Sequence, residues 1–457
     1  MKAIAISDTD YLALRQALFT SDGKENAAFL VCGVSETKDN FTYLIREVLP
    51  VPDDGYVERL SYHLEIAPRF INSVVDRCVG KGFGIVATHS HPGHGIASYS
   101  TSDDHGESRL FAVFADLLGP RKHASLLFTQ DDIAGRLFAD RRREQLDRLT
   151  VVGEHLDHIA LRKRVTSRGA RPSNTLSRQL LAFGEEGQGR LRELRIGIVG
   201  VGGTGSAVVE QLARLGVERF VLVDPDHFEV SNLSRLYGSR IDDTKHESLA
   251  KTKIASRLIK SINPGAEVKQ VQDSVVRQPV LMQLRECDVI FACTDNDWSR
   301  SVLNRLAYQY LIPLIDLGIR ITVSGAAVTG IGGRVARVGP GTACLRCARH
   351  LDPERIRAES MPAEQRSSLA KEQYIKGVEN PAPAVVSYNS TVAGLAVSEL
   401  LSLVLRIGSS DRANELMYDG MEGIVFRVRP EADPRCDVCS PMGLKAIGDL
   451  QVVSAYD

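Results

Sequence analysis

Four cysteines stand in two CxxC pairs, and thiols at this spacing are typical of zinc sites. The pairs read CLRC at residues 344–347 and CDVC at residues 436–439. Each CxxC turn brings two sulfurs near one point, and two such turns complete a tetrahedral shell without an open position. The spacing therefore predicts a structural Zn²⁺ site made by the thiolates of Cys344, Cys347, Cys436 and Cys439. Redox-active or incidental pairs are the alternative interpretation.

Two histidines and a carboxylate form a second group of metal ligands near the N-terminus. His89 and His91 follow the apolar run Phe83–Thr88, and Asp103 comes shortly afterwards. Histidines one residue apart on an extended segment point to a common side, and a nearby carboxylate adds a third ligand. Three protein ligands and a water make an open, hydrolytic zinc site. We expect His89, His91 and Asp103 to bind a catalytic Zn²⁺.

A glycine-rich turn, GVGGTG at residues 200–205, separates an apolar run at Arg195–Val201 from an expected helix. Glycines at this place let backbone amides approach phosphates at a helix N-terminus. Asp224 ends the next expected strand, where a carboxylate can accept hydrogen bonds from ribose hydroxyls. Both features also fit a dehydrogenase that binds NAD.

The residues around this turn favour ATP over NAD. The polar and cationic side chains that follow the expected strands, or precede the first of them, are Arg178, Gln179, Gln188, Asn232, Arg235, Lys251, Asp295 and Arg300. Hydride transfer needs few cations. Adenylation needs several, because negative charge builds on the α-phosphate and the leaving pyrophosphate as a carboxylate attacks.

With these motifs, residues 176–439 resemble the ThiF/MoeB/HesA family, the prokaryotic relatives of ubiquitin-activating enzymes. The resemblance implies that Gly200, Gly202 and Gly203 cradle ATP and that Asp224 holds the ribose. It also implies that Asn232, Arg235 and Lys251 contact the phosphates and that Asp295 holds Mg²⁺. Of these residues, Arg235, Lys251 and Asp295 would be catalytic.

Two further features follow from the same resemblance. Arg178 matches an arginine that reaches the nucleotide of the other subunit, which implies a homodimer. Lys253 is a second candidate for the role of Lys251, but the number of residues between the lysine and Asn263-Pro264 favours Lys251.

The N-terminal histidine segment resembles the JAB/JAMM metalloprotease motif, whose members cleave peptide or isopeptide bonds at the C-terminus of ubiquitin and its relatives. By this resemblance Ser100 steadies the tetrahedral oxyanion, and Glu25, ahead of an early strand, is the general base. The stretch from His91 to Ser100 is one residue longer than is usual in this motif. An alternative assignment therefore shifts the motif by one residue, with Thr101 in place of Ser100 and Asp104 in place of Asp103.

A thioester-forming cysteine is missing. Relatives that form a thioester carry a cysteine between the two CxxC pairs, and this sequence has none there. The other four cysteines (Cys32, Cys78, Cys287 and Cys293) lie in the N-terminal domain or at a core strand. We therefore expect the reaction to stop at the acyl-adenylate, or to pass it to a thiol on another protein. A serine nucleophile within residues 360–368 is an alternative.

Composition bounds the classes of partner. The chain has 457 residues, a formal net charge of −1 and 43% hydrophobic residues, which favours ordinary globular cores and gives no reason to expect nucleic acid. The N-terminus lacks the pattern of a signal peptide, and the apolar stretch Val392–Ile407 carries Glu399 and Arg406, so we expect a buried helix rather than a membrane span. We expect a cytoplasmic protein without membrane contact.

The fold class that we predict is α/β, with a mixed JAB-type domain followed by a Rossmann-like domain with a mainly parallel sheet. The predicted domains are residues 1–150, a linker at 151–175, an adenylation domain at 176–440 and a tail at 441–457. Leucines at helical spacing in Arg141–Val165 suggest a helix leading out of the first domain, and TSRGARPSN at residues 166–174 suggests a linker.

The two halves suggest one kind of partner, a ubiquitin-like or sulfur-carrier protein, with a conjugating or thiol-bearing protein downstream. One domain would adenylate the carrier's C-terminus, and the other would trim or deconjugate the same carrier. Alternatively, the chain activates a sulfur carrier for cofactor biosynthesis, and an inactive JAB domain serves as its binding module.

Overall fold

The computed structural model describes residues 1–119, 123–139, 142–161, 174–246, 248–361, 383–408 and 413–453. The chain divides into two compact units. Unit 1 contains Met1–Arg168 together with Gln309–Leu311 and Leu444–Val452, and unit 2 contains the remainder. Part of the expected C-terminal tail therefore belongs to the N-terminal unit. Within the expected linker at 151–175, residues 162–173 lie outside the described residues.

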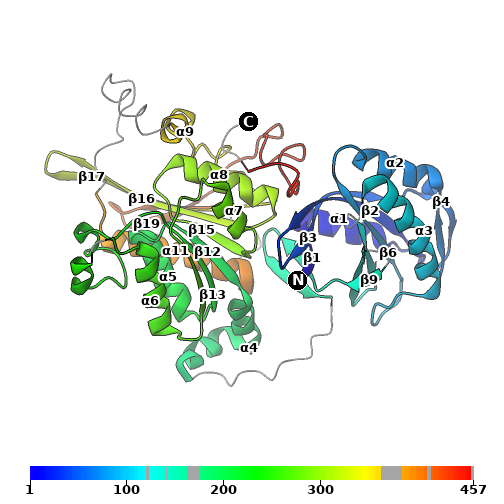
Figure 1. Ribbon diagram of the computed structural model, residues 1–457, viewed down its shortest axis with the longest axis horizontal. Helices are drawn as coiled ribbons and strands as arrows, with labels where there is room; N and C mark the ends of the chain where they lie inside the picture. Colours follow the sequence, from blue (N-terminus) through cyan, green and yellow to red (C-terminus); the bar gives the residue numbers. More distant parts are fainter. Residues whose placement is uncertain are drawn as a thin grey trace. The chain divides into compact units, whose positions relative to one another are not determined.

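Unit 1 is built on a nine-stranded mixed sheet in the order β11-β10-β1-β3-β2-β6-β7-β8-β9 (Figure 1). Its strands are β1 (Lys2–Ser7), β2 (Ala27–Glu36), β3 (Phe41–Pro50), β6 (Gly84–Ser90), β7 (His123–Phe128), β8 (Ile133–Ala139), β9 (Arg142–Gln145), β10 (Arg148–Val152) and β11 (Leu156–Ala160). The other elements are a short strand pair, β4 (Tyr56–Arg59) and β5 (Leu64–Ile66), and the helices α1 (Asp8–Leu18), α2 (Pro68–Cys78) and α3 (Thr101–Leu118).

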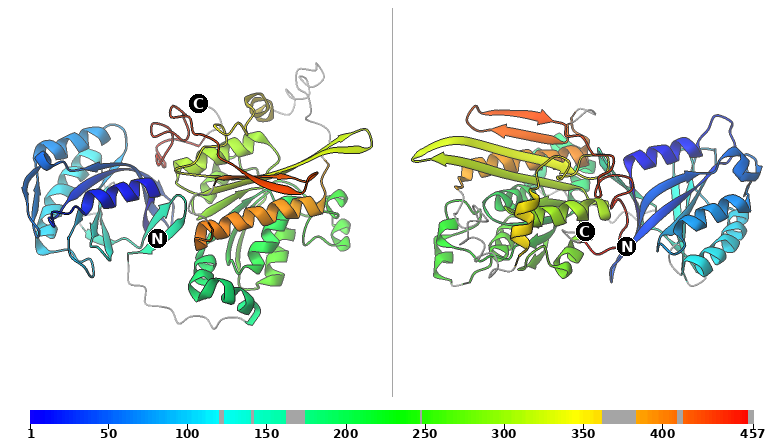
Figure 2. Two further views of the ribbon diagram at one scale, coloured as in Figure 1. Left: turned by 180° about the vertical axis from the view of Figure 1, so that it is seen from behind. Right: turned by 90° about the horizontal axis from the view of Figure 1, so that it is seen from above.

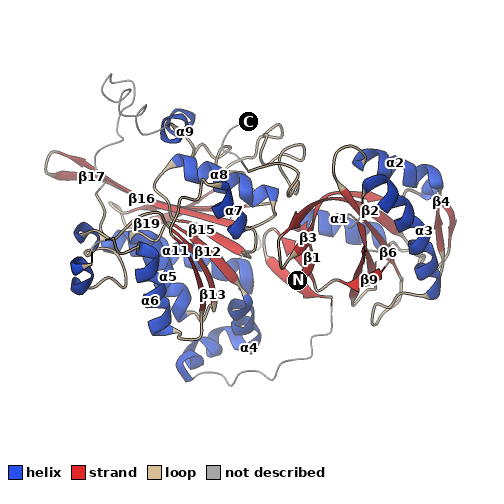
Figure 3. Ribbon diagram, in the orientation of Figure 1, coloured by secondary structure: helices blue, strands red, loops and turns tan. Residues whose placement is uncertain are grey.

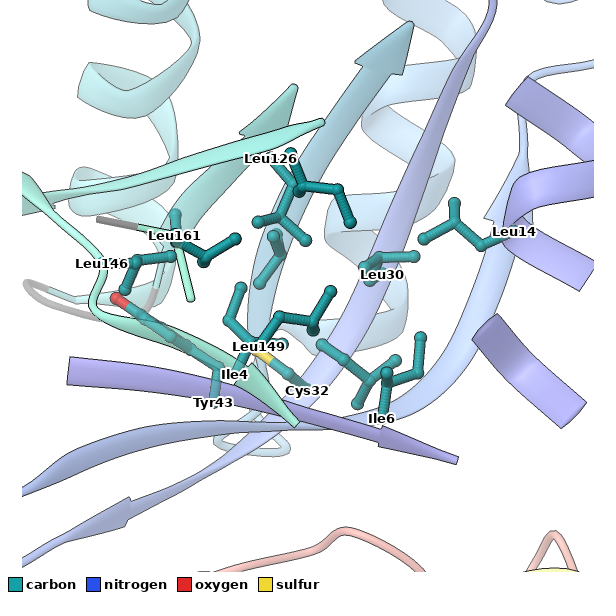
Figure 4. Close-up of a cluster of buried hydrophobic side chains, with 14 of the residues drawn as sticks. Ile4, Ile6, Leu14, Leu30, Cys32, Tyr43, Leu126, Leu146, Leu149 and Leu161 are labelled. Atoms are coloured by element: carbon teal, nitrogen blue, oxygen red, sulfur yellow. The ribbon is translucent and has the colours of Figure 1, made fainter. Parts of the chain in front are cut away.

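Strand β2 is buried on both faces and so divides the core of unit 1 in two. Ala28, Leu30 and Cys32 point into a cluster that includes residues of α1, as Figure 4 shows for Leu30, Cys32 and Leu14. The alternate residues of β2, such as Phe29, join a second cluster with α2 and α3. The period of two fixes the register of β2, because a slip by one residue would exchange the two faces.

The helix that we expected at Arg141–Val165 is wrong, since the described part of this stretch, residues 142–161, contains β9, β10 and β11. Its leucines satisfy a helical spacing, but Leu149 and Val151 are two residues apart and both enter the first core cluster. Burial at period two, in the β-branched run RLTVV, outweighed the helical pattern. The sheet of unit 1 therefore continues past the domain boundary that we placed at residue 150.

Unit 2 is built on an eight-stranded sheet in the order β14-β13-β12-β15-β16-β17-β18-β19 (Figure 3). Its strands are β12 (Arg195–Val199), β13 (Arg219–Val223), β14 (Glu267–Val271), β15 (Val289–Ala292), β16 (Leu314–Ser324), β17 (Ala327–Val338), β18 (Glu415–Asp419) and β19 (Ile424–Val428). The first five are parallel, and β16 to β19 pair antiparallel. The predicted α/β fold class with a parallel sheet is confirmed.

Chain order reverses at the centre of this sheet. Strand β12 pairs in parallel with β13 on one side and with β15 on the other. In an open α/β sheet, ligands bind beyond the carboxyl ends of the strands at such a switch point. The glycine turn follows β12 directly, so the topology places it at this position.

The described helices of unit 2 are α4 (Ser177–Glu193), α5 (Gly203–Arg214), α6 (Lys251–Ile262), α7 (Gln278–Leu284), α8 (Asp297–Gln309), α9 (Pro353–Ser360) and α11 (Val386–Leu405). Helix α11 packs against α5 and against β16 and β17 (Figure 2). By length and composition α11 could also cross a membrane, but 56% of its most apolar window is buried, and core helices of soluble proteins meet the same criterion. It contains the expected buried helix from Val392 to Leu405, but it begins six residues earlier and ends two residues before Ile407.

Candidate functional site

The glycine turn after β12 has a backbone that only glycine adopts easily. Gly200 has a φ of +86°, and a Cβ there would lie 2.7 Å from the carbonyl oxygen of Cys293. A Cβ on Gly205 would collide with the carbonyl oxygen of Gly200. Gly202 is the N-cap of α5, with no side-chain cap and open space where its Cβ would lie. The first amides of α5 are therefore open to an anionic ligand.

Asp224 connects the turn to the end of β13. Its carboxylate is 4% exposed and accepts hydrogen bonds from the amides of Val201 (2.7 Å) and Asp226 (2.9 Å). Burial raises the pKa of Asp224, whereas Lys251 lowers it. Lys251 is the first residue of α6, and its ammonium lies 2.7 Å from a carboxylate oxygen of Asp226. A carboxylate and a cation thus lie together beside the glycine turn.

Arg235 lies beside Gly203 of the turn. A Cβ on Gly203, the first residue of α5, would come 3.3 Å from Cδ of Arg235. The guanidinium donates to the carbonyl oxygen of Ser231 at 2.7 Å. Asn232 is buried, and its side-chain oxygen accepts from the amide of Glu229 at 3.2 Å, so it stabilises the short helical turn that precedes Arg235. The structure therefore brings Gly203 and Arg235 together and gives Asn232 a structural contact.

Arg178 and Asp295 are both exposed. Arg178 is in the first turn of α4, and within the described part of the chain it forms no ion pair. Asp295 follows β15 by a few residues, at the carboxyl edge where the glycine turn also lies. Both positions allow contact with a ligand or a second chain.

Three other polar residues, which we expected around the nucleotide, have structural contacts. The side-chain amides of Gln179 and Gln188 donate to the carbonyl oxygens of Arg214 and Leu215, at the C-terminal end of α5. Arg300 lies 3.2 Å from the fully buried carboxylate of Asp316, which Arg334 also contacts. The cation that we expected near the phosphates at Arg300 instead neutralises this buried acid.

The four thiols of the CxxC pairs meet within unit 2. The sulfurs of Cys344 and Cys436 are 3.7 Å apart, and those of Cys347 and Cys439 are 3.6 Å apart. All four lie within 4.8 Å of one another. Backbone amides donate to these sulfurs, among them those of Asp433 and Val438. A closed shell of four sulfurs fits a structural zinc ion.

The predicted ligands of the second metal site also meet, in unit 1. The ligand atoms of His89, His91 and Asp103 lie within 4.8 Å of one another. Nε2 of His89 is 3.1 Å from Oδ1 of Asp103, and Nε2 of His91 is 3.6 Å from Oδ2. Nε2 of His89 is buried yet has no hydrogen-bond partner among the described residues. A buried ring nitrogen facing an imidazole and a carboxylate fits a zinc ion with an open position.

Glu25 lies beside these ligands, and 5% of it is exposed. Its Oε1 is 3.7 Å from Nε2 of His91, because Ala27 of β2 pairs with His89 of β6. Burial raises the pKa of the Glu25 carboxyl, and the neighbouring His89 and His91 lower it. The geometry suits a group that exchanges protons near the metal ligands.

Ser100 and Asp103 also form a capping box at the start of α3. The hydroxyl of Ser100 accepts from the amide of Asp103 and donates to its carboxylate, and the amide of Ser100 donates to the same carboxylate. The spacing Ser-x-x-Asp before an apolar run is the sequence signal of this motif. We did not predict the capping box from the sequence, although the signal is present.

The alternative frame does not place its carboxylate with the histidines. Asp104 is paired with Arg136 at 2.8 Å and with Arg143 at 3.4 Å. His94 and His105 are exposed. Asp103 is thus the carboxylate that the fold turns toward His89 and His91.

Comparison with known proteins identifies the family of unit 2. The family model described as the ThiF family matches residues 176–438. The chain belongs to the ThiF family. This ThiF-family region runs from the start of α4 into the second CxxC pair, so it includes the glycine turn and three of the four clustered thiols, and Cys439 is the next residue after it.

Several relatives resemble this ThiF-family chain. It is 29% identical over 272 residues to the SAMP-activating enzyme E1 of Haloferax volcanii, covering 60% of this chain and 90% of that protein. It is 29% identical over 256 residues to the sulfur carrier protein adenylyltransferase of Thermus thermophilus, covering 56% and 86%. Among solved structures, E. coli MccB with ATP is 19% identical, with a TM-score of 0.46 and coverage of 59% of this chain and 75% of that one.

Proposed function

We propose that this chain uses ATP to adenylate the C-terminal carboxylate of a ubiquitin-like or sulfur-carrier protein. Membership of the ThiF family and the names of the two relatives described above support this reaction. The observation that carries the proposal is the glycine turn at the switch point of the sheet, with Arg235 beside Gly203 and Lys251 near Asp224. The cytoplasm, where ATP is available and thiols stay reduced, is the compartment that fits.

The proposed roles follow from position. The amides of Gly202 and Gly203 at the N-terminus of α5 receive the phosphates, and Asp224 accepts from the ribose while it holds the turn. A carboxylate oxygen of the carrier attacks the α-phosphorus. The bond from that phosphorus to the bridging oxygen breaks, and pyrophosphate leaves with the electron pair. Arg235, Lys251 and Asn232 stabilise the charge that develops.

Asp295 is the proposed ligand of Mg²⁺, which would neutralise part of the charge of the phosphates when bound. Its exposed carboxylate at the carboxyl edge of the sheet suits this ion, which keeps several waters and binds through one or two carboxylates.

Pyrophosphate exchange tests the main reaction. Purified protein, given ATP, radiolabelled pyrophosphate and a small β-grasp carrier ending in glycine, should form labelled ATP only when the carrier is present. Binding of NAD without exchange would instead support the dehydrogenase alternative.

We propose that the acyl-adenylate passes to a thiol on another protein. The chain has no cysteine between residues 347 and 436. Of the remaining four, Cys32, Cys78 and Cys287 are buried and Cys293 is half-buried. Burial raises the pKa of the Cys32 and Cys287 thiols, and it raises that of Cys78 to about 11. A thiol held neutral in this way is a poor nucleophile. A carrier adduct on this chain that dithiothreitol removes would contradict this step.

A second proposed activity belongs to unit 1, a zinc peptidase that processes or deconjugates the same carrier. Its support is the meeting of His89, His91 and Asp103 beside the buried Glu25. When bound, Zn²⁺ would polarise the attacking water and the scissile carbonyl. Glu25 would take the proton of the water and return it to the leaving amine, and Ser100 would donate to the developing oxyanion.

Mass spectrometry of a carrier precursor distinguishes this activity from a binding module. The wild type should shorten the precursor to its terminal glycine, and His89→Ala should leave the precursor intact. If both proteins leave it intact while both still bind the carrier, unit 1 is a binding module and only the adenylation proposal stands.

A further inference from the structure

One buried polar side chain at the glycine turn has no role in the proposed chemistry. Asn389 lies in the first turn of α11, and 2% of it is exposed. Among the described residues its side-chain amide has no hydrogen-bond partner, and the amide group is not completely closed off from the surroundings. Buried amides are nearly always hydrogen-bonded, because an unpaired one costs about 1–3 kcal/mol. A partner from outside the described chain is therefore expected.

The amide of Asn389 occupies the space that glycine leaves open at residue 203. A Cβ on Gly203 would collide with Nδ2 of Asn389, and the same Cβ would lie 3.3 Å from Cδ of Arg235. Gly203 is the first residue of α5. The amide nitrogen and the arginine side chain thus converge on the N-terminus of one helix, whose amides lack a side-chain cap.

Two hydrogen bonds hold this arrangement. The hydroxyl of Tyr237 is 2.8 Å from that of Ser390, the residue after Asn389. The amide of Tyr237 donates to the hydroxyl of Ser206 on α5 at 3.0 Å. Helix α11 also packs along α5. The position of Asn389 against the glycine turn is therefore fixed by the packing of two helices and by the segment that carries Arg235.

We propose that the side-chain amide of Asn389 donates a hydrogen bond to the phosphate chain of ATP at the N-terminus of α5. The proposal rests on the adenylation function proposed above. Backbone amides and the Asn389 amide are donors at this position, and the side chain of the cationic Arg235 lies beside them. This set of groups suits phosphoryl oxygens, which only accept. Gly203 is required both for the approach of the phosphates and for the approach of this side chain.

Equilibrium binding of ATP, without a carrier, tests the role directly. Loss of a hydrogen bond to a charged group should weaken ATP binding by Asn389→Ala about tenfold or more. Asn389→Asp keeps the shape but places a carboxylate beside the phosphates, so it should weaken binding further than Asn389→Ala. Both variants should bind adenosine, which has no phosphate, with wild-type affinity. Ser398→Ala, on an exposed site of the same helix, is the matched control and should bind ATP as the wild type does.

Wild-type affinity of Asn389→Asp for ATP would overturn the proposal, and so would equal losses for ATP and adenosine, which would indicate a structural role. Asn389→Ser serves as a replacement if a variant does not fold by circular dichroism. Pyrophosphate exchange by the wild type distinguishes a failure of the proposed adenylation function from a failure of the role proposed for Asn389. If the wild type does not exchange, the adenylation function fails. If it exchanges and the Asn389 variants match it in ATP binding, only this inference fails.

Discussion

Individual side chains should differ in how strongly their removal lowers the rate of pyrophosphate exchange. The side chain of Lys251 is 13% exposed and is paired with Asp226, whereas that of Lys245 is 73% exposed and paired with Asp242. Lys251→Ala should lower the rate of pyrophosphate exchange about 100-fold, because a donor aimed at the developing charge is lost. Lys245→Ala is the control and should leave the rate unchanged. Equal rates for the two variants would remove Lys251 from the proposed mechanism.

His123 is a buried titratable residue of unit 1 far from any proposed chemistry. It is 1% exposed, its ring lies 5.1 Å from that of Phe111, and neither ring nitrogen has a hydrogen-bond partner among the described residues. Burial lowers its pKa from 6.5 to about 4. Between these two values the unfolded chain binds a proton that the folded chain refuses. The free energy of unfolding should therefore fall as pH decreases from 6.5 to 4, by about 3 kcal/mol at most.

Replacement of His123 by leucine should remove this pH dependence. The free energy of opening of β7, measured by hydrogen exchange, should differ between His123→Leu and the wild type by an amount that grows as the pH falls from 7 to 5. A difference that stays constant over this range would show that the histidine remains neutral in the unfolded chain as well, or that it is protonated in the folded one.

At the scale of elements, the C-terminal segment Leu444–Val452 completes unit 1 by packing on β2. The amide of Asp449 donates to the carbonyl oxygen of Val34 (2.7 Å), and its carboxylate accepts from the amide of Glu36 (2.8 Å). A Cβ on Gly33 would collide with the carbonyl oxygen of Ala446. The segment thus needs glycine at residue 33 for its backbone to approach the strand.

Gly33→Ala should displace this segment. Hydrogen exchange should become faster in residues 444–452 and at the end of β2, and unit 1 should lose about 1–3 kcal/mol of stability through the clash and the lost hydrogen bonds. Gly106→Ala is the control, because a Cβ at that helical position meets no atom within 4 Å. Unchanged exchange in residues 444–452 of Gly33→Ala would show that the segment does not depend on this approach.

The sequence predicted the elements whose patterns are local. Apolar runs such as Phe83–Thr88 and Arg219–Asp224 became β6 and β13, and the glycine turn stands between β12 and α5. It did not predict the strands β9 to β11, where burial against residues far along the chain decided the structure. It also did not indicate Asn389, because an asparagine in an apolar helix becomes informative only when the packing of α11 on α5 places it beside Gly203.

At the scale of the whole molecule, the two clusters of metal ligands should differ in their effect on stability. The Cys344 and Cys436 sulfurs join segments far apart in unit 2, so their zinc should stabilise the fold. The His89 cluster is held by strand pairing and by the capping box of α3. We expect about two zinc ions per chain in the wild type. Cys436→Ser should lose one ion and unfold at lower temperature, and His89→Ala should lose the other ion with little change in unfolding temperature.

Metal analysis by mass spectrometry, with calorimetry on the same samples, checks this expectation. Glu65→Ala, on a surface position of unit 1, is a control that should keep both ions. One zinc ion in the wild type, retained by His89→Ala, would support a unit 1 that binds the carrier without hydrolysing it.

If the chain forms the proposed homodimer, two inactive variants should restore activity to each other when they are mixed. If Arg178 reaches the nucleotide of the second copy, Arg178→Ala and Lys251→Ala damage two different halves of each site. In a mixture of the two inactive variants, half of the dimers are mixed, and each mixed dimer contains one intact site. Pyrophosphate exchange should recover to about a quarter of the wild-type rate, because a twofold symmetric dimer has two such sites. Arg190→Ala, which changes another residue of α4, is the control. A mixture of Arg190→Ala and Lys251→Ala should show no more activity than the Arg190→Ala protein contributes alone. Absence of recovery, with a single monomeric species in sedimentation, would place Arg178 outside the site and leave each subunit to act alone.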